Sequence, residues 1–304
     1  SLNSTKRKMT VGYSNMGKYY AQTDGDPDQS GNLLCFYSGT SEPFSGSFSG
    51  SINREHVWPN SRGGNQVEDD IHMPRPTLVR ENGSRGNSFY VEGQKSSSSG
   101  WDPAMESFGK EYYRGISARI IFYCVVASSG LSLVDKTTDA TGNHTMGKLS
   151  DLLKWNLEYP VDATEIRRND AAMDIQGNRN PFIDDRSLAC KIWGDYNENT
   201  RNVCATYTTT PEPSSLTIES NTTTIGEGGT LNLTVTAYPS GASNDVTWSS
   251  SNHAVASVDK HGLVTANGEG SAVITATSTL NTAISVSITI TVKSISYITL
   301  SGTP

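Results

Sequence analysis

Cysteine and histidine are scarce in this 304-residue chain, which has four cysteines and five histidines. No CxxC pair occurs, so the sequence argues against a structural zinc site. No apolar run approaches the ~20 residues that a membrane-spanning helix needs. The opening SLNSTKRKMT has neither an apolar signal-peptide core nor an initiator Met, which fits a processed or trimmed chain.

An excess of basic charge is also missing, since the net charge is −7. Residues 1–208 hold 22 basic and 25 acidic side chains, and the remainder holds 2 and 6. Neither part has the charge balance of a strong nucleic-acid binder. Binding to a polyanion would therefore depend on a local group of basic residues.

The four cysteines fall into two groups. Cys35 in NLLCFY and Cys124 in IIFYCVV lie in apolar sequence, so we expect both to be buried as small hydrophobic residues. Cys190 and Cys204 lie in polar sequence. They are either free or joined in a disulfide that closes a loop, and the sequence leaves both alternatives open.

The length fits two domains. The Thr-, Pro- and Ser-rich segment TYTTTPEPSSL, 206–216, indicates a linker between them. We therefore expect one domain over 1–208 and a second over 209–294. SSLTIES at 214–220 is similar to SYITLSG at 296–302, so residues 295–304 would begin a further, truncated copy of the second domain.

The first domain mixes helix and strand patterns. Helices are predicted at 114–128, 148–159 and 162–177. Pro160 ends the second, and the third has Asp162 as its N-cap and Gly177 as its C-cap. A strand is predicted at 32–39, and Thr77 to Asn82 would form a helical turn or two that Gly83 breaks.

The second domain shows strand patterns throughout. Strictly alternating segments predict strands at 230–237, 272–278 and 285–292. DVTWSSSNHAVASVDKHGLVTANGEGSAVITATS, at 245–278, resembles the bacterial Ig-like group 2 domains of cell-surface proteins. The resemblance implies a β-sandwich that serves as an extracellular spacer or adhesive module. Trp248 would then pack in its core, while His253 and His261 would lie in loops.

A candidate site lies in NREHVWP, 53–59, where Glu55 and His56 are adjacent. Neighbours on a regular strand point to opposite faces, so joint action at one centre requires a strand end or irregular backbone. Pro59 fits a strand end. The alternatives are an ordinary surface turn or a zinc peptidase, and the peptidase lacks a second histidine four residues away.

The segment EDDIHMPRPTLVRENGSRGN, 68–87, adds arginines and Asn82. A carboxylate on Glu55 and an amide oxygen on Asn82 are hard ligands that suit Mg²⁺. A neutral imidazole, as in His56, is a suitable general base near pH 7. Together they predict metal-assisted hydrolysis of a phosphodiester, with arginines holding flanking phosphates.

Three segments carry a resemblance to the bacterial endonuclease I family: NREHVWPNS at 53–61, DDIHMPRPTLVRENGSRGN at 69–87, and LLKWNLEYPVDATEIRRNDAAMDIQGNRNPFID at 152–184. The resemblance implies an α+β fold with a ββα-metal (His-Me finger) motif. It also implies a secreted endonuclease that cuts DNA, and in many members RNA, with little base preference. Where the family block reads Asp-Leu-His-Asn-Leu, this chain has Asp70-Ile71-His72-Met73-Pro74.

The resemblance also assigns roles to residues. His56 would be the general base, and Glu55 and Asn82 would hold Mg²⁺, or another divalent cation such as Mn²⁺ or Ca²⁺. The candidates for contacts with nucleic-acid phosphates are Arg54, Arg62, Arg80, Arg85 and Arg179.

Several residues keep two interpretations. In QGNRNPF, 176–182, Arg179 and the asparagines either contact phosphates or satisfy backbone groups in a tight turn. Arg167 and Arg168 either belong to the site or form a solvated helix face. His72 is interpreted as a structural hydrogen-bonding residue rather than a second base, and His144 as a loop residue.

The leading hypothesis is a bacterial nuclease that is monomeric and not inserted in a membrane. It is either secreted or attached to the cell surface through further Ig-like repeats. The alternative is a surface adhesion protein whose nuclease-like front domain binds a polymer without cutting it. Cleavage of a plasmid with Mg²⁺, with and without EDTA, distinguishes the two.

Overall fold

The computed structural model describes residues 10–48, 50–95, 99–205, 212–240 and 242–294. The chain divides into two compact units, Ser1–Thr209 and Thr210–Pro304, which are described one at a time below. Most of the predicted linker, at 206–211, and the predicted truncated repeat at 295–304 lie outside the described residues.

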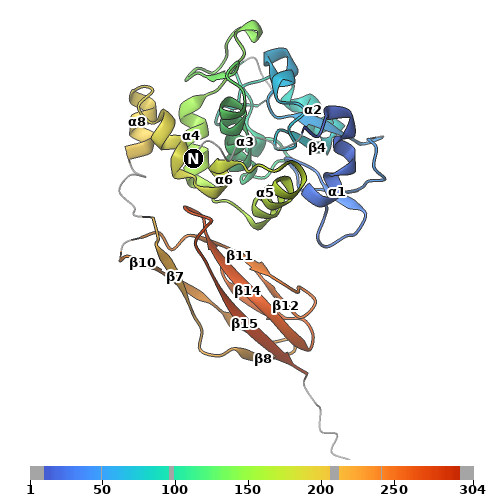
Figure 1. The fold of residues 1–304 in the computed structure, drawn as a ribbon, viewed down its shortest axis with the longest axis vertical. Helices are drawn as coiled ribbons and strands as arrows, with labels where there is room; N and C mark the ends of the chain where they lie inside the picture. The colour runs from blue at the N-terminus through green and yellow to red at the C-terminus, as the bar shows by residue number, and fades with distance from the viewer. Residues whose placement is uncertain (1–9, 49, 96–98, 206–211, 241, 295–304) are drawn as a thin grey trace, which may run out of the picture. The chain divides into compact units, whose positions relative to one another are not determined.

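The front unit combines short strands with helices (Figure 1). Its strands are β1 Asn32–Leu34, β2 Ser41–Pro43, β3 Ile52–His56, β4 Pro74–Leu78, β5 Ser132–Leu133 and β6 Thr145–Met146. Its α-helices are α1 Tyr20–Thr23, α2 Val79–Arg85, α3 Tyr113–Ala127, α4 Leu149–Glu158, α5 Ala163–Gln176, α6 Pro181–Asp184, α7 Ser187–Trp193 and α8 Glu198–Ala205.

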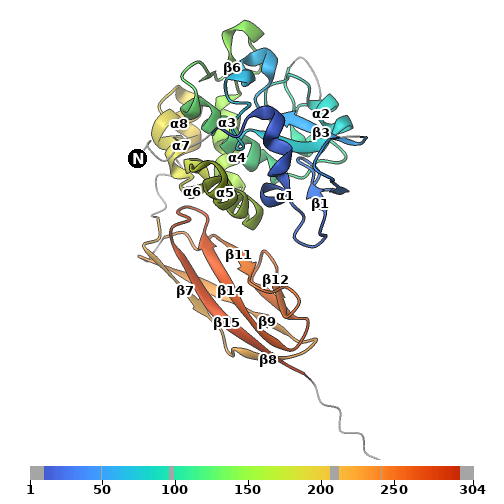
Figure 2. The ribbon, with the colours of Figure 1, turned by 45° about the vertical axis from the view of Figure 1, so that its right-hand side comes forward.

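Helix α3 runs through the middle of this unit, with β3, β4 and α2 to one side and α7 and α8 to the other (Figures 1 and 2). Residues from Ile116 to Cys124 are all buried, as expected of a helix that is apolar on all sides. Cys124 is among them and Cys35 is also buried and free, which confirms the prediction for both. The helix therefore forms the scaffold against which the site is built.

The other two predicted helices are also confirmed. Helix α4 ends at Glu158, just before Pro160, and its apolar face is buried in the core. At the start of α5 the side chain of Asp162 accepts a hydrogen bond from the amide of Glu165 at 2.7 Å, and Gly177 ends the helix with φ 78°. These caps satisfy backbone groups that the helix itself leaves unpaired.

Buried ion pairs tie the helices to the strands. Asp24 accepts hydrogen bonds from Arg75 of β4 at 2.8 Å and from Arg168 of α5 at 3.1 Å. Glu165 of α5 forms a buried pair with Arg119 of α3. The interpretation of Arg168 as part of a solvated helix face is therefore wrong, because its guanidinium compensates the charge of a buried carboxylate.

Two local predictions are wrong. The strand predicted at 32–39 ends at Leu34, because the chain turns back at Tyr37 and the amide of Gly39 bonds the carbonyl of Cys35 at 2.8 Å. The helix predicted to begin at Thr77 begins at Val79 and runs past Gly83. Pairing with β3 keeps the chain extended to Leu78, and an interior glycine costs a helix only about 1 kcal/mol.

A disulfide joins Cys190 in α7 to Cys204 in α8. This settles the alternative that the sequence left open. The bond closes the loop between two short helices, which restricts the unfolded chain and favours their packing against each other.

In the rear unit, the residues that the structure describes form strands and turns without a helix. The strands are β7 Ser215–Glu219, β8 Thr224–Gly226, β9 Thr230–Asn232, β10 Thr234–Tyr238, β11 Val246–Ser250, β12 Ala256–Val258, β13 Leu263–Ala266, β14 Gly270–Ser278 and β15 Ser285–Lys293. They form sheets in the orders β11-β14-β15-β8, β12-β13-β9 and β10-β7, and Figure 2 shows β14 and β15 lying side by side.

The strands predicted at 272–278 and 285–292 are confirmed as β14 and β15. The one predicted at 230–237 is divided at Leu233, because β9 pairs with β13 whereas β10 pairs with β7. Trp248 packs against the buried apolar cluster of this unit, and His253 and His261 lie in turns. Within the described residues of the whole chain, no helix has the length and apolar content to cross a membrane.

Candidate active site

The candidate site is built on two antiparallel strands and the helix that follows them. Strand β3 pairs with β4 from Ile52 opposite Leu78 to His56 opposite Pro74, and α2 begins at the next residue, Val79. Asn82 of α2 is fixed against β3, because its Nδ2 donates to the carbonyl of Arg54 at 2.9 Å and to Oδ1 of Asn53 at 3.0 Å. The order strand, strand, helix therefore places Asn82 against β3 at Asn53 and Arg54.

Glu55 is the buried member of the Glu-His pair, with 1% of its surface exposed. Its Oε1 accepts a hydrogen bond from the hydroxyl of Tyr37 at 2.8 Å and lies 3.5 Å from Nε of Arg85. Burial raises the pKa of the Glu55 carboxyl to about 7, although Arg85 and the Tyr37 hydroxyl both act to lower it. The Glu55 carboxyl group is therefore buried away from water, and the hydrogen bond from Tyr37 fixes its orientation.

His56 ends β3, with 17% of its side chain exposed. Its Nε2 lies 3.4 Å from Oε2 of Glu68, close enough for an ion pair but without the geometry of a hydrogen bond. Its ring centroid lies 5.1 Å from that of Tyr13. Burial lowers the pKa of His56 below its ordinary value, and Glu68 partly opposes this. The imidazole is therefore neutral near pH 7, as a general base must be.

Three of the five candidate arginines differ in their surroundings: Arg54 borders His56 through Tyr13, Arg62 is buried, and Arg80 reaches solvent. The guanidinium of Arg54 lies 4.0 Å over the ring of Tyr13. Arg62 is buried, donates to the carbonyls of Asn87 and Asp139, and lies 4.5 Å over the ring of Phe89. Arg80 has 70% of its side chain exposed. Of these, Arg80 is the most accessible to a nucleic-acid phosphate.

The other two candidates are engaged with carboxylates. Arg85 is 1% exposed and, besides Glu55, binds the carbonyl of Val57 at 2.7 Å. Arg179 pairs with Asp170 at 2.6 Å and with Asp184 at 2.8 Å. Neither arrangement suits direct binding of phosphate, because the guanidinium already has anionic or carbonyl partners.

The structural interpretation holds for the asparagines of QGNRNPF. Asn178 and Asn180 are both buried. Asn178 donates to the hydroxyl of Tyr123 at 2.6 Å, and Asn180 accepts from the amide of Phe182 at 3.0 Å. His72 is also buried, with Nε2 3.4 Å from the carbonyl of Asn178, so it lies in this hydrogen-bonded layer. His144 lies in a loop, with φ 51°.

No group of three or more His, Cys, Asp and Glu side chains that could hold a metal occurs among the described residues. Glu55 and Asn82 instead supply two oxygen donors. Each has one side-chain atom committed to the protein, Oε1 and Nδ2 respectively. The remaining oxygens, Oε2 of Glu55 and Oδ1 of Asn82, fit Mg²⁺, which takes one or two protein ligands and keeps several waters.

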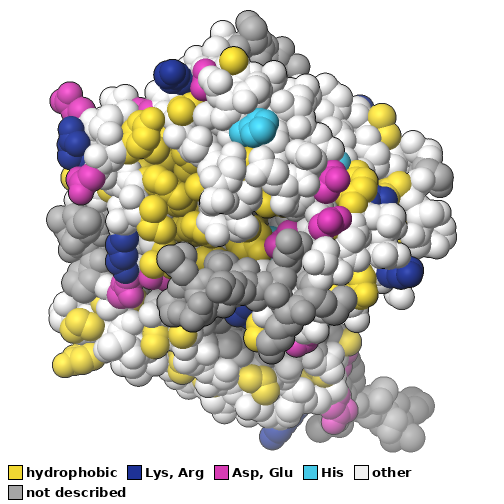
Figure 3. Space-filling model, turned by 45° about the horizontal axis from the view of Figure 1, so that its top comes forward, with side chains coloured by type: hydrophobic (Ala, Val, Ile, Leu, Met, Phe, Trp, Pro, Cys, Tyr) yellow, Lys and Arg dark blue, Asp and Glu magenta, His cyan; other side chains and the backbone are white. Residues whose placement is uncertain are grey.

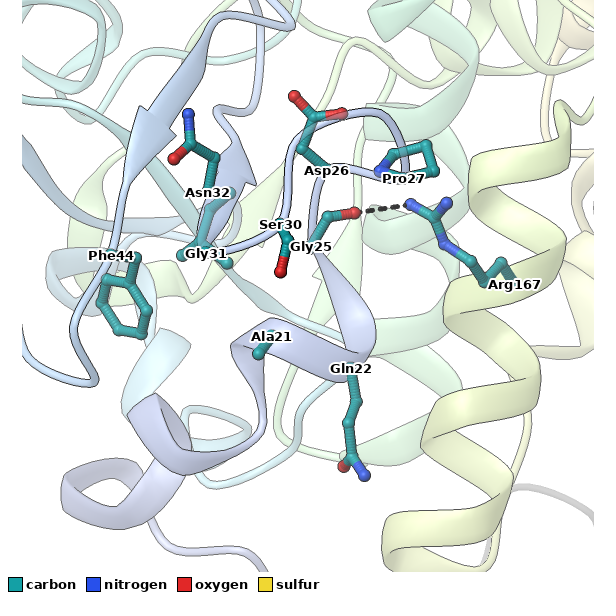
Figure 4. A pocket seen from close by; sticks show the side chains of 11 residues that line it. Ala21, Gln22, Gly25, Asp26, Pro27, Ser30, Gly31, Asn32, Phe44 and Arg167 are labelled. Carbon is teal, nitrogen blue, oxygen red and sulfur yellow. Dashed lines mark hydrogen bonds between the residues drawn. The ribbon is translucent and has the colours of Figure 1, made fainter. Parts of the chain in front are cut away.

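A surface pocket of about 430 Å³ lies elsewhere, between α1, the loop that follows it, and α5 (Figure 4). Arg167 reaches into it from α5 and donates to the carbonyl of Gly25 at 2.9 Å. None of Glu55, His56 and Asn82 lines this pocket. The chemistry of the donor groups, rather than the size of a cavity, therefore identifies the candidate site.

Sequence reasoning missed three neighbours of the Glu-His pair: Tyr13, Tyr37 and Glu68. Glu68 was visible as the first residue of EDD in the 68–87 segment, but nothing in the sequence indicated that it faces His56. Tyr37 lies 18 residues before Glu55 in a segment predicted as strand. Only the tertiary fold brings these side chains together.

The fold and the site define a two-part chain in which a mixed α/β unit carries a Glu-His pair at a strand end and an all-β unit follows. Residues 2–187 match the family model of endonuclease I, and residues 214–294 match that of the bacterial Ig-like domain (group 2). The chain belongs to the endonuclease I family, and an Ig-like domain follows its nuclease domain.

Two curated relatives are similar to this chain. An "Extracellular ribonuclease" of Bacillus amyloliquefaciens is 36% identical over 205 residues, which are 60% of this chain and 68% of the relative. An "Extracellular ribonuclease" of Bacillus subtilis (strain 168) is 33% identical over 220 residues, 64% of this chain and 74% of the relative. Among solved structures, an EHEC O157:H7 intimin mutant is 30% identical over 26% of this chain and 46% of its own, with a TM-score of 0.22.

Proposed function

We propose that this protein is an extracellular, divalent-cation-dependent endonuclease that hydrolyses phosphodiesters of RNA and DNA with little regard to base sequence. The observation that carries the proposal is the imidazole of His56 at the end of β3, next to Glu55 in the chain, on a strand to which Asn82 of α2 is hydrogen-bonded. Family membership and the two ribonuclease relatives support a nucleic-acid substrate.

His56 acts as the general base in this proposal. Its lowered pKa keeps the ring neutral near pH 7, so it can take a proton from the water that attacks phosphorus. Glu68, 3.4 Å from Nε2, then faces the imidazolium that forms and stabilises its charge. A positioned base of this kind contributes about 10²- to 10⁴-fold to a rate.

Glu55 and Asn82 hold the cation through Oε2 and Oδ1. A bound Mg²⁺ would neutralise the negative charge on the oxygens of the phosphate that is cleaved. Two oxygen donors from the protein match the preference of this ion for water and phosphate as its other ligands. Mn²⁺ or Ca²⁺ would meet the same donor set.

The substrate is held through its phosphates rather than its bases. Arg80 is exposed, and Arg54 lies over the ring of Tyr13, which neighbours His56. On the face shown in Figure 3, Lys and Arg side chains lie singly, several beside Asp or Glu. Modest, salt-sensitive binding with little sequence preference follows, because phosphate contacts carry no base information.

Cleavage assays test the proposal. With Mg²⁺, the purified chain is expected to degrade both a plasmid and a fluorescent RNA. The fragments should cover a continuous range of lengths rather than form discrete bands. Excess EDTA is expected to abolish both activities, and added Mg²⁺ to restore them. Degradation that EDTA does not suppress would contradict the metal assignment. If neither substrate were cut with Mg²⁺, Mn²⁺ or Ca²⁺, the alternative of an adhesion protein with an inactive front domain would be favoured.

A further inference from the structure

The Glu55 carboxylate is held by the protein through only one of its two oxygens. The hydroxyl of Tyr37 donates to Oε1 at 2.8 Å, and Nε of Arg85 lies 3.5 Å from the same atom. Among the described residues, no hydrogen bond to Oε2 accompanies the one that Tyr37 donates to Oε1. Because only Oε1 is bonded to the protein, Oε2 is left for a metal ion.

Tyr37 reaches Glu55 from an unusual backbone conformation. Its φ is 78°, and its side chain is fully buried. The left-handed region is unfavourable for a bulky residue, so this conformation persists only where its surroundings enforce it. Phe36 and Trp101, with ring centroids 4.4 and 4.7 Å away, enclose the ring. The fold therefore fixes the direction in which the hydroxyl points.

The direction of the hydrogen bonds is also determined. Tyr90 lies with its hydroxyl 2.6 Å from that of Tyr37. An ionised carboxylate can only accept, so the single proton of Tyr37 goes to Glu55. Tyr90 must then donate to Tyr37, which gives a chain from Tyr90 through Tyr37 to Glu55. Such chains strengthen each of their members in a buried environment.

Arg85 would otherwise compete for the carboxylate. Guanidinium and carboxylate groups tend to pair through two parallel hydrogen bonds that take up both oxygens. Here Nε of Arg85 lies 3.5 Å from Oε1 of Glu55, which is longer than a normal hydrogen bond, and the guanidinium donates instead to the carbonyls of Val57 and Gly86. With Oε1 already bonded to Tyr37, a bidentate pair does not form.

We propose that Tyr37 is a positioning residue for the metal ligand Glu55: its hydroxyl fixes Oε1, prevents Arg85 from taking both oxygens, and leaves Oε2 to a divalent cation. The inference rests on the proposed function and adds to it a residue that acts on cation affinity without touching cation or substrate. Groups that orient a metal ligand in this way typically contribute 10- to 100-fold to affinity.

The test is calorimetric titration of Mn²⁺ into metal-free protein for the wild type, Tyr37→Phe and a matched control. The control is Tyr113→Phe, which removes another buried hydroxyl of the same core, one that donates to the carbonyl of Cys35 at 3.2 Å and not to Glu55. Tyr37→Phe is expected to raise the Kd for Mn²⁺ about 10-fold, and Tyr113→Phe to leave it unchanged. Cleavage by Tyr37→Phe is expected to recover at saturating Mn²⁺, since His56 is untouched.

Two outcomes would overturn the inference, and they are distinguishable. If the wild type binds Mn²⁺ and Tyr37→Phe binds it equally well, Tyr37 does not position the ligand while the proposed function stands. If the wild type binds no divalent cation, the proposed function fails as well. Tyr90→Phe gives a second measurement should Tyr37→Phe not fold, because loss of the donor 2.6 Å from Tyr37 is expected to weaken Mn²⁺ binding by a smaller factor.

Discussion

Replacing His56 with alanine is expected to lower kcat for RNA and DNA cleavage by about 10³-fold, within the range that a general base contributes. Binding of nucleic acid should change little, because the contacts with phosphates come from arginines. The expectation follows from the position of the ring, which ends β3, keeps 17% of its side chain exposed and has a lowered pKa. Single-turnover cleavage of a fluorescent oligonucleotide measures the effect.

A control separates catalysis from folding in this experiment. His144 lies in an exposed loop, so His144→Ala should cleave like the wild type. Affinity for the oligonucleotide and thermal unfolding are measured for both variants. If His56→Ala lost binding together with cleavage, or unfolded at a much lower temperature, the residue would be structural and its role as the base would be wrong.

A large effect of pH on stability is expected from His72. Burial lowers the pKa of this imidazole from 6.5 to about 4, with Asp70 and Asp184 opposing that change and Arg168 reinforcing it. Between these two values the unfolded chain binds a proton that the folded chain does not, so stability falls as the pH falls from 6.5 to 4. The folded state should lose about 3 kcal/mol in this window.

The variant His72→Gln isolates this contribution from that of the carboxyl groups. Urea unfolding is measured from pH 7.5 to 4 for the wild type and the variant. The wild type is expected to be the more stable at pH 7.5, because its buried imidazole is packed and lies 3.4 Å from the Asn178 carbonyl. The difference should shrink by about 3 kcal/mol toward pH 4. Parallel curves for the two proteins would show that His72 is not protonated selectively in the unfolded state.

The sequence was informative where a signal is local. Helix α4 was predicted from the apolar face that repeats along it and from Pro160 after its end, and α5 from the capping residues Asp162 and Gly177. The paired strands β14 and β15 were predicted from strict alternation. These features are determined by residues a few positions apart, so no knowledge of the tertiary fold is needed.

Local signals were not sufficient where long-range contacts decide. The chain reverses at Tyr37 although its neighbours favour a strand, and pairing with β3 delays the start of α2. Arg168 lies on a helix whose sequence is polar. Its guanidinium nevertheless pairs with the buried carboxylate of Asp24, which is 144 positions earlier in the chain. Charge alone does not reveal whether a guanidinium faces solvent or a buried carboxylate.

The same division applies to the candidate site. Glu55, His56 and Asn82 were selected from short motifs. Strand β3 carries the first two, and Asn82 of α2 is hydrogen-bonded to β3 at Asn53 and Arg54. The sequence offered five arginines as equivalents, whereas Arg85 and Arg179 are bound to carboxylates and Arg80 is exposed. Tyr37 and Glu68 lacked a motif of their own, because their roles depend on distances that only the folded chain defines.

The central claim is that a divalent cation lies between Glu55 and Asn82, next to His56. Its most direct test is anomalous diffraction from crystals of the protein soaked in Mn²⁺. We expect one strong anomalous peak within coordination distance of Oε2 of Glu55 and Oδ1 of Asn82. A protein that cleaves nucleic acid with Mn²⁺ but shows no peak there, or shows one bound to other residues, would contradict it.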